Sequence, residues 1–146
     1  MQFLVEHGAD PTAQNKDGSS PLHLASENGH VEVAQFLVEH GADPTAQNKY
    51  GWSPLHKASQ GGHVEIVQFL VEHGANPTIH KDGWSPLHSA SENGYVKVVQ
   101  FLVEHGADPT ALDKCGCSPL QLASEKGHVE VAQFLVESRI ACVLNE

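Results

Sequence analysis

Four near-identical segments follow one another along this chain, and this regularity restricts the possible folds more than any other feature. The pattern Gly-x-Ser-Pro-Leu recurs at steps of 33, 32 and 33 residues, beginning at Gly18, Gly51, Gly83 and Gly116. The pattern His-Gly-Ala recurs at similar steps, at His7, His40, His73 and His105. Periods of about 20 to 50 residues are typical of stacked units, each packed only on its neighbours. The sequence therefore predicts a repeat protein.

Within each segment the residues predict two helices and an extended loop. In the first segment Ser20 can cap a helix that starts at Pro21, and Gly29 can end it by tolerating a positive φ. A second helix is expected over residues 31–40, with polar side chains on one stripe and apolar ones elsewhere. An Asp-Pro pair then breaks the helical pattern, and extended chain leads to a turn at residues 48–51. One such unit cannot bury its apolar surface alone, whereas a stack of them can.

The stretch SPLHLASENGHVEVAQFLVEHGAD, residues 20–43, closely resembles the ankyrin repeat, whose pattern is TPLHxA, then GH, an apolar helix and GAD. The resemblance covers nearly the whole chain. It implies an all-α ankyrin-repeat solenoid of stacked helix-turn-helix units with short β-turn fingers. Within a single domain, 1–146, the expected parts are a partial repeat and four repeats, the last with a divergent tail: 1–14, 15–47, 48–79, 80–112 and 113–146.

Charge and composition argue against several kinds of partner. The 146 residues carry a formal net charge of -10 with only 8 Lys and Arg, so the basic stripe needed for nucleic acid or an anionic membrane is lacking. No 18-residue apolar run and no signal peptide is recognisable. The 3 cysteines are an odd number and all fall in the last third, unlike a secreted disulfide framework. A cytoplasmic setting is therefore expected. The acidic balance suits either solubility or a protein partner with some basic surface.

The ends of the chain and its third finger depart from the repeat pattern. Neither end shows the polar capping repeat that solenoids normally need, and beyond residue 137 the His-Gly-Ala-Asp pattern gives way to an unrelated tail. Weak end-to-end self-association through these uncapped termini is therefore expected. Between Ile79 and Gly83 the loop is one residue shorter than its counterparts. The finger that carries Trp84 is thus expected to sit differently.

The histidines and cysteines do not predict a metal site. Of the 11 histidines, all but His80 fall at three repeat positions. Copies of one position lie about 10 Å apart, too far to share a zinc ion. The resemblance assigns one set to hydrogen bonds between neighbouring loops (His23, His56 and His88), and His80 has no evident partner. Cys115-Gly116-Cys117 lacks the C-x-x-C spacing, so surface thiols are expected there.

No catalytic motif is recognisable either. A G-x-S-x-G elbow, a P-loop and an H-E-x-x-H helix are all missing from the sequence. Ser-His pairs occur only within SPLH, where the Ser hydroxyl is expected to cap a helix. Glutamates recur on the second helices as a solvated outer face. The prediction is a protein without enzymatic activity, cofactor or metal.

The residues that differ between copies are the informative ones. The ankyrin resemblance places them on the finger tips and first helices, the concave face by which family members bind other proteins. A row of lysines at the tips gives that face a basic character. The predicted partner-binding residues are Asp17, Ser19, Lys49, Tyr50, Trp52, Lys57, Gln60, Lys81, Asp82, Trp84, Ser89, Glu92, Asn93, Cys115 and Cys117.

Three aromatic residues in this set leave two functions open. Tyr50, Trp52 and Trp84 belong to the residue types that usually dominate binding energy, which favours a non-catalytic protein–protein interaction module that grips one partner by its second and third fingers. Alternatively, the Trp rings lie flat on adjacent loops and shield them. That interpretation favours a structural or designed repeat scaffold with no cognate partner.

Overall fold

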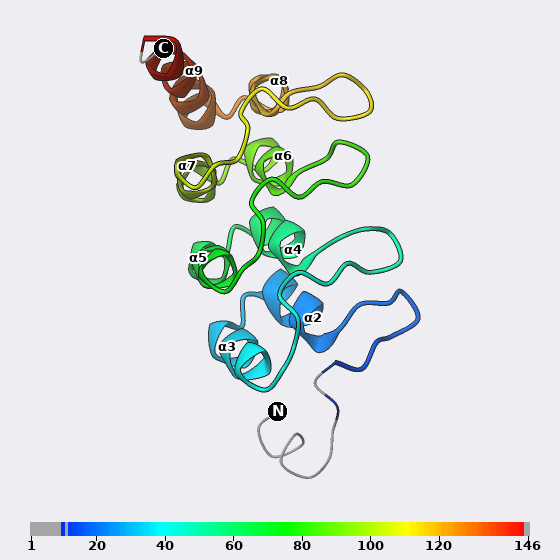
Figure 1. The fold of residues 1–146 in the computed structure, drawn as a ribbon. Helices are drawn as coiled ribbons and strands as arrows, with labels where there is room; N and C mark the ends of the chain where they lie inside the picture. The colour runs from blue at the N-terminus through cyan, green and yellow to red at the C-terminus, as the bar shows by residue number, and fades with distance from the viewer. Residues whose placement is uncertain (1–9, 11, 145–146) are drawn as a thin grey trace. The chain divides into compact units, whose positions relative to one another are not determined.

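In the computed structural model the chain consists of two compact units, Met1–Asn76 and Pro77–Glu146. The structure describes residue 10 and residues 12–144, with side chains as far as residue 138. These residues form eight α-helices and no sheet (Figure 1), which confirms the predicted all-α fold. Most of the predicted partial repeat and the Cys142 side chain lie outside the described residues. The repeat boundaries within the chain remain a prediction.

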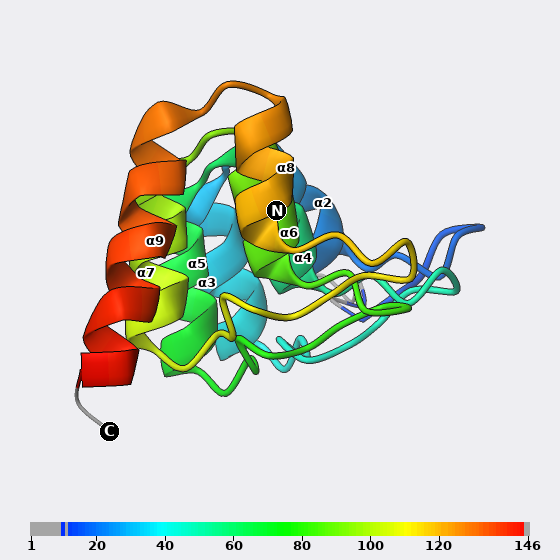
Figure 2. The ribbon, with the colours of Figure 1, turned by 90° about the horizontal axis from the view of Figure 1, so that it is seen from above.

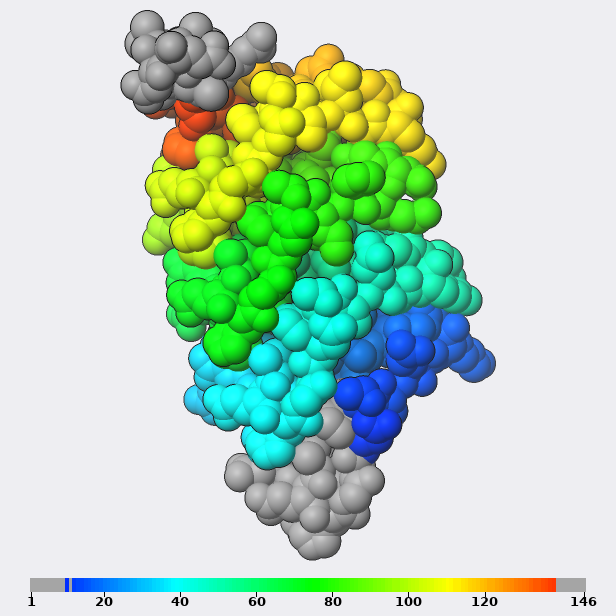
Figure 3. Space-filling model, in the orientation of Figure 1, coloured from blue at the N-terminus to red at the C-terminus, as the bar shows by residue number. Residues whose placement is uncertain are grey.

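The first unit contains two helix pairs that pack on each other. They are α2 (Pro21–Asn28) with α3 (Val31–Glu39), and α4 (Pro54–Gly61) with α5 (Val64–Glu72). Helix α2 lies beside α4 and α3 lies beside α5, while the loops before α2 and α4 project as fingers on the side of these first helices (Figures 1 and 2). The space-filling view shows the two fingers in contact with each other (Figure 3).

The second unit repeats this arrangement with one longer helix. Its pairs are α6 (Pro86–Glu92) with α7 (Val96–Glu104), and α8 (Pro119–Glu125) with α9 (Val129–Leu144). Helix α6 packs on α8, and α7 on α9. Helix α9 has 16 residues where α7 has 9. The divergent tail lacks the His-Gly stop that ends α7, so the backbone of residues 138–144 continues the helix.

Every first helix begins in the same way. The N-cap serine side chain accepts a hydrogen bond from the N–H of the third helical residue, whose own side chain accepts one from the serine N–H, and proline occupies the first turn. This reciprocal capping satisfies two N–H groups that a helix start leaves unpaired. The predicted caps are confirmed at Ser20, Ser53, Ser85 and Ser118. The partner is a histidine in three repeats and Gln121 in the fourth.

The helices are short and depend on their neighbours for stability. Helices of seven to nine residues are marginal in isolation, so most of their stability comes from packing of their apolar sides. Leu22, Leu55 and Leu87 occupy one repeat position on the first helices and are completely buried. Leu37, Leu70 and Leu102 do the same on the second helices. Together with buried alanine, valine and isoleucine side chains, these leucines form the core of each unit.

The third finger has a different turn from the others, as its shorter loop predicted. Lys81 and Trp84 exchange backbone hydrogen bonds of 2.9 Å in both directions across Asp82-Gly83. Both central residues have positive φ, 51° and 83°, as a two-residue type I′ turn requires. The other fingers have a longer turn, closed for example by the bond from the Asn15 N–H to the Ser19 carbonyl. Deleting one residue thus gives the third finger a tighter hairpin.

One polar position is buried without a hydrogen-bond partner. The Ser26, Ser59 and Ser91 side chains lie in the first helices at equivalent places, and each residue is 0% exposed. None of the three hydroxyl groups has a hydrogen-bond partner. The equivalent Ser124 is exposed. Since a buried hydroxyl without a partner loses its hydrogen bonds to water, serine is a destabilising choice at the three buried positions.

Replacing Ser26 or Ser91 by alanine is therefore expected to stabilise the protein. Each variant should gain about 1 kcal/mol in free energy of unfolding, because the helix keeps its small side chain and loses an unpaired buried hydroxyl. Ser124→Ala is the matched control and should stay within about 0.5 kcal/mol of the parent chain. Urea unfolding followed by circular dichroism measures all three. A loss of stability in Ser26→Ala and Ser91→Ala would contradict this account.

Candidate functional site

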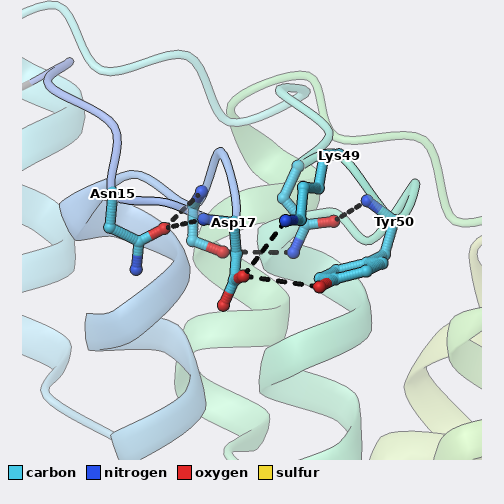
Figure 4. A network of polar contacts seen from close by, with 6 residues as sticks. Asn15, Asp17, Lys49 and Tyr50 are labelled. Carbon is cyan, nitrogen blue, oxygen red and sulfur yellow. Dashed lines mark hydrogen bonds and ion pairs between the residues drawn. The ribbon is translucent and has the colours of Figure 1, made fainter.

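The tips of the two fingers in the first unit form a polar cluster (Figure 4). The Tyr50 hydroxyl donates a hydrogen bond of 3.4 Å to Asp17 Oδ1, and Lys49 Nζ lies 3.7 Å from the same oxygen. Lys49 Nζ also lies 5.1 Å from the centre of the Tyr50 ring, within the range of a cation–π contact. The three side chains belong to two successive repeats. We call Asp17, Lys49 and Tyr50 the tip cluster.

The backbone beneath the tip cluster is firmly held. Asn48 Oδ1 accepts hydrogen bonds of 2.9 and 3.0 Å from the N–H groups of Tyr50 and Trp52. The Asn48 amide nitrogen donates to the Ser19 hydroxyl at 3.1 Å, and the Lys49 N–H donates to the Asp17 carbonyl at 2.9 Å. Side-chain bonds of this kind fix turn geometry, and the last two join one finger to the next. The fingers of the first unit therefore form one rigid support.

The contacts within the tip cluster are weak by comparison. The Lys49 and Asp17 side chains are each 53% exposed, and ion pairs at such exposure contribute less than about 1 kcal/mol. Tyr50 is 49% exposed, and its hydrogen bond to Asp17 is long. A partner could replace these contacts at little cost. The arrangement combines a rigid backbone with accessible charged and aromatic side chains.

The sequence did not single out the residues that support the fingers. Asn15 Oδ1 accepts from the Asp17 and Ser19 N–H groups at 2.9 and 3.1 Å, as Asn48 does in the next finger. Asp113 does the same for Cys115 and Cys117, at 2.8 and 2.9 Å. An Asn or Asp three residues before a glycine is a known turn signal and would have located all three residues.

The tryptophan of each unit lies against its own helix. The Trp52 and His56 rings form a T-shaped contact with a centroid distance of 5.1 Å, and Trp84 stacks on His88 at 5.2 Å. Both tryptophans are half-buried. The Trp84 indole N–H also donates a 2.7 Å hydrogen bond to the hydroxyl of Ser89, which is buried. Part of each ring therefore shields the finger, and the remaining part is open to solvent.

The predicted binding residues include buried, half-buried and exposed side chains. Ser19 and Ser89 are buried and support their neighbours through the hydrogen bonds given above. Those with exposed side chains are Asp17, Lys49, Tyr50, Gln60, Asp82, Asn93 and Cys115. Those that are half-buried are Trp52, Lys57, Lys81, Trp84, Glu92 and Cys117. The expected basic row is partly neutralised, because Lys49 pairs with Asp17 and Lys81 Nζ lies 3.1 Å from Asp82.

The cysteines of the fourth finger are surface thiols, as predicted. Cys115 is exposed and Cys117 is half-buried, and both are free thiols. Desolvation and then the negative charges of Asp113 and Glu125 raise the pKa of the Cys117 thiol. Since the thiolate is the reactive form, Cys117 is a poor nucleophile.

The histidines of the SPLH pattern join successive repeats. In the first unit His23 Nδ1 accepts the Ser20 N–H at 3.1 Å, so the ring proton is on Nε2, which donates to the Trp52 carbonyl at 2.9 Å. In the second unit His88 bonds Ser85 and the Cys117 carbonyl in the same way, both at 3.1 Å. Burial lowers the pKa of both imidazoles because it disfavours the charged form. These rings link loops, as the ankyrin resemblance implied.

The expectation that His80 has no partner is wrong. His80 occupies the place of Asn48 in the shortened finger, and its Nδ1 accepts the Gly83 N–H at 3.3 Å.

In the described part of the chain, no group of three or more His, Cys, Asp or Glu side chains could hold a metal ion. None of the helices described has the length and hydropathy that a membrane span requires.

The helix pairs, their caps and the projecting fingers define a class: a helical repeat protein. Three overlapping stretches, residues 1–81, 41–113 and 79–145, match the family description "Ankyrin repeats (3 copies)". The chain therefore belongs to the ankyrin-repeat family. Such repeats are generally protein-interaction modules without catalytic activity.

Two ankyrin repeat proteins share short, similar segments with this chain. Ankyrin repeat protein YahD of Escherichia coli (strain K12) is 51% identical over 35 residues, which is 24% of this chain and 17% of that protein. An ankyrin repeat protein of Rickettsia felis (strain ATCC VR-1525 / URRWXCal2) is 70% identical over 23 residues, 16% of this chain and 10% of that protein. The matched segments thus span less than a fifth of either relative.

Two buried histidines, His23 and His88, predict a loss of stability in mild acid. Both have folded-state pKa values below the ordinary 6.5, so the unfolded chain binds protons more readily. Their contribution to stability is complete above pH 6.5 and is lost as the pH falls from there toward the folded-state pKa. The free energy of unfolding should therefore fall as the pH is lowered below about 6.5.

Substituting both histidines tests this assignment. His23→Gln and His88→Gln together should flatten the pH dependence, and glutamine keeps the cap, since Gln121 Oε1 already accepts the Ser118 N–H at 2.8 Å in the fourth repeat. The pKa of Asp43 is held below its ordinary 3.8 by hydrogen bonds from Thr45, so its effect falls in a lower pH window. Urea unfolding at several pH values measures the difference. An unchanged slope in the double variant would refute the assignment.

Proposed function

We propose that this protein is a non-catalytic interaction module that binds a partner protein through the concave face of its fingers and first helices. The observation that carries the proposal is the tip cluster, where Tyr50 is 49% exposed on a rigid finger. Tyrosine supplies contact area at low entropic cost and is frequent among residues that dominate binding energy. The other fingers have Asp17, Asp82 and Cys115 at this position.

The proposed binding residues are described separately for each unit. In the first unit they are Asp17, Lys49, Tyr50, Trp52, Lys57 and Gln60. In the second unit they are Lys81, Asp82, Trp84, Glu92, Asn93, Cys115 and Cys117. Ser19 and Ser89 support these residues from beneath and are not proposed to touch the partner. The net charge of -10 favours a partner with some basic surface.

The second candidate function is a structural scaffold with no cognate partner. It is favoured by Trp84, whose indole N–H is already bonded to Ser89 and whose ring lies on His88. In that case the aromatics of the fingers would serve stability alone. The two candidates differ in what happens to binding when an exposed finger residue is removed while the fold is retained.

A photo-cross-linking experiment separates the two. A benzophenone amino acid at the exposed Gln60, in α4, should capture a protein from a cell lysate that the same group at the exposed Glu65, on the outer helix α5, does not capture. Identical capture profiles at the two positions would favour the scaffold.

The captured protein then allows a quantitative test of the tip cluster. Tyr50→Ala should weaken its binding by about 2 kcal/mol, or roughly 30-fold, because an exposed aromatic anchor is lost. Glu65→Ala is the control and should leave the affinity within about twofold. Circular dichroism should show the same helix content in both variants. Unchanged affinity in Tyr50→Ala would exclude the tip cluster from the binding site.

A further inference from the structure

The tip cluster holds one of the chain's own cations between a carboxylate and an aromatic ring. Lys49 Nζ lies 3.7 Å from Asp17 Oδ1 and 5.1 Å from the centre of the Tyr50 ring (Figure 4). A carboxylate beside an exposed aromatic ring attracts organic cations, because the carboxylate charge and the ring face are both negative. Asp17 and Tyr50 thus form a cation site, and Lys49 occupies it.

Lys49 fills this site poorly. Its distance to Asp17 Oδ1 exceeds that of a charge-assisted hydrogen bond, which is about 2.8 Å. The contact uses one carboxylate oxygen, and no described residue bonds Asp17 Oδ2. The two side chains are each 53% exposed, so water competes with the ion pair. A cation that reaches both oxygens and covers the ring would bind there more firmly than this lysine does.

An arginine side chain has these properties. Its guanidinium group is planar, bonds both oxygens of a carboxylate at once and stacks on aromatic faces, whereas a lysine ammonium acts as a point charge. The Tyr50 hydroxyl lies 3.4 Å from Asp17 Oδ1, so the ring and the carboxylate are adjacent and one guanidinium group can contact both. The net charge of -10 also attracts a cationic group to the protein.

The backbone of the two fingers holds the site in place. The Lys49 N–H donates a 2.9 Å hydrogen bond to the Asp17 carbonyl, which joins one fingertip to the next. Asn48 Oδ1 accepts the Tyr50 N–H at 2.9 Å. Binding therefore requires only that the Lys49 side chain swings away, and leaving an exposed ion pair costs little.

The second unit has one half of this site. Asp82 stands at the repeat position of Asp17, and its carboxylate lies 3.1 Å from Lys81 Nζ. Cys115 stands at the position of Tyr50, so the aromatic ring is missing. Lys114, the counterpart of Lys49, is exposed. The second unit therefore supplies a matched control for the lysine.

We propose that the tip cluster is a binding site for an arginine side chain of the partner, which displaces Lys49 and lies between Asp17 and Tyr50. This inference rests on the proposed function and names the chemistry by which the surface recognises its partner. Lys49 then competes with the partner for the site. Removing Lys49 therefore strengthens binding, whereas removing a residue that contacts the arginine weakens it.

Titration of the full chain with N-acetyl-arginine methylamide, followed by NMR signals of Asp17 and Tyr50, tests the site. Binding is expected on the order of 1 mM, and the citrulline analogue, which lacks the charge, should not saturate these signals. Asp17→Asn and Tyr50→Leu should each weaken binding at least about fivefold, because each removes one half of the site. Tyr50→Phe keeps the ring and should bind within about twofold of the parent chain.

The lysine variants decide the proposal. Lys49→Ala should strengthen binding of N-acetyl-arginine methylamide about threefold, because the competing cation is gone. Lys114→Ala removes the same charge from the second unit and should leave the affinity unchanged. Weaker binding in Lys49→Ala would overturn the proposal. So would an equal gain in both lysine variants, or equal binding of the arginine and citrulline compounds.

The protein captured through Gln60 separates this inference from the proposed function. Its affinity should rise in Lys49→Ala and fall in Asp17→Asn. If its affinity falls in Tyr50→Ala and in Lys49→Ala alike, the interaction module is retained and the arginine site is overturned. If no protein is captured, the proposed function fails, and the titration with N-acetyl-arginine methylamide still decides whether the tip cluster binds a guanidinium group.

Discussion

A pair of helices with eight and nine residues cannot keep its own apolar side out of water. The packing of the two helix pairs on each other within each unit is the constraint on which this structure depends. Within each unit that packing buries a leucine completely and seats a histidine ring on a glycine. His23 in the first unit and His88 in the second each add a bond to a carbonyl of the next finger. A substitution at these positions removes contacts from two repeats at once. The packing positions therefore differ less from one repeat to the next than the finger tips do.

Positions outside this packing are free to differ, and the proposed function depends on them. The backbone of the first two fingers is held by Asn15, Asn48 and the bond from Lys49 to Asp17, whatever side chains the tips carry. A tyrosine on such a tip is presented to solvent by a support that needs no reorganisation on binding, which favours affinity.

Much of the fold could be predicted because its signals are local or periodic. Serine caps, first-turn prolines and the 33-residue period specify the helices and their order without reference to distant residues. The tip cluster could not be predicted, since it depends on side chains from Asp17 and Tyr50, 33 residues apart, that meet only once the fingers are packed. The bond from Trp84 to Ser89 depends on one rotamer. The hairpin at Asp82-Gly83 could be predicted in part. The sequence showed that its loop is one residue shorter, but it did not show that His80 accepts a hydrogen bond from the Gly83 N–H.

The central claim is that the packing positions maintain the fold while the differing positions bind the partner. Its most direct test gives the second repeat the finger residues of the first, in the triple variant Tyr50→Asp, Trp52→Ser and Lys57→Leu. The first repeat already folds with these residues, so the free energy of unfolding should change by less than about 2 kcal/mol. Affinity for the protein captured through Gln60 should fall at least about 100-fold. A variant that folds and binds that protein as tightly as the parent chain does would contradict the account.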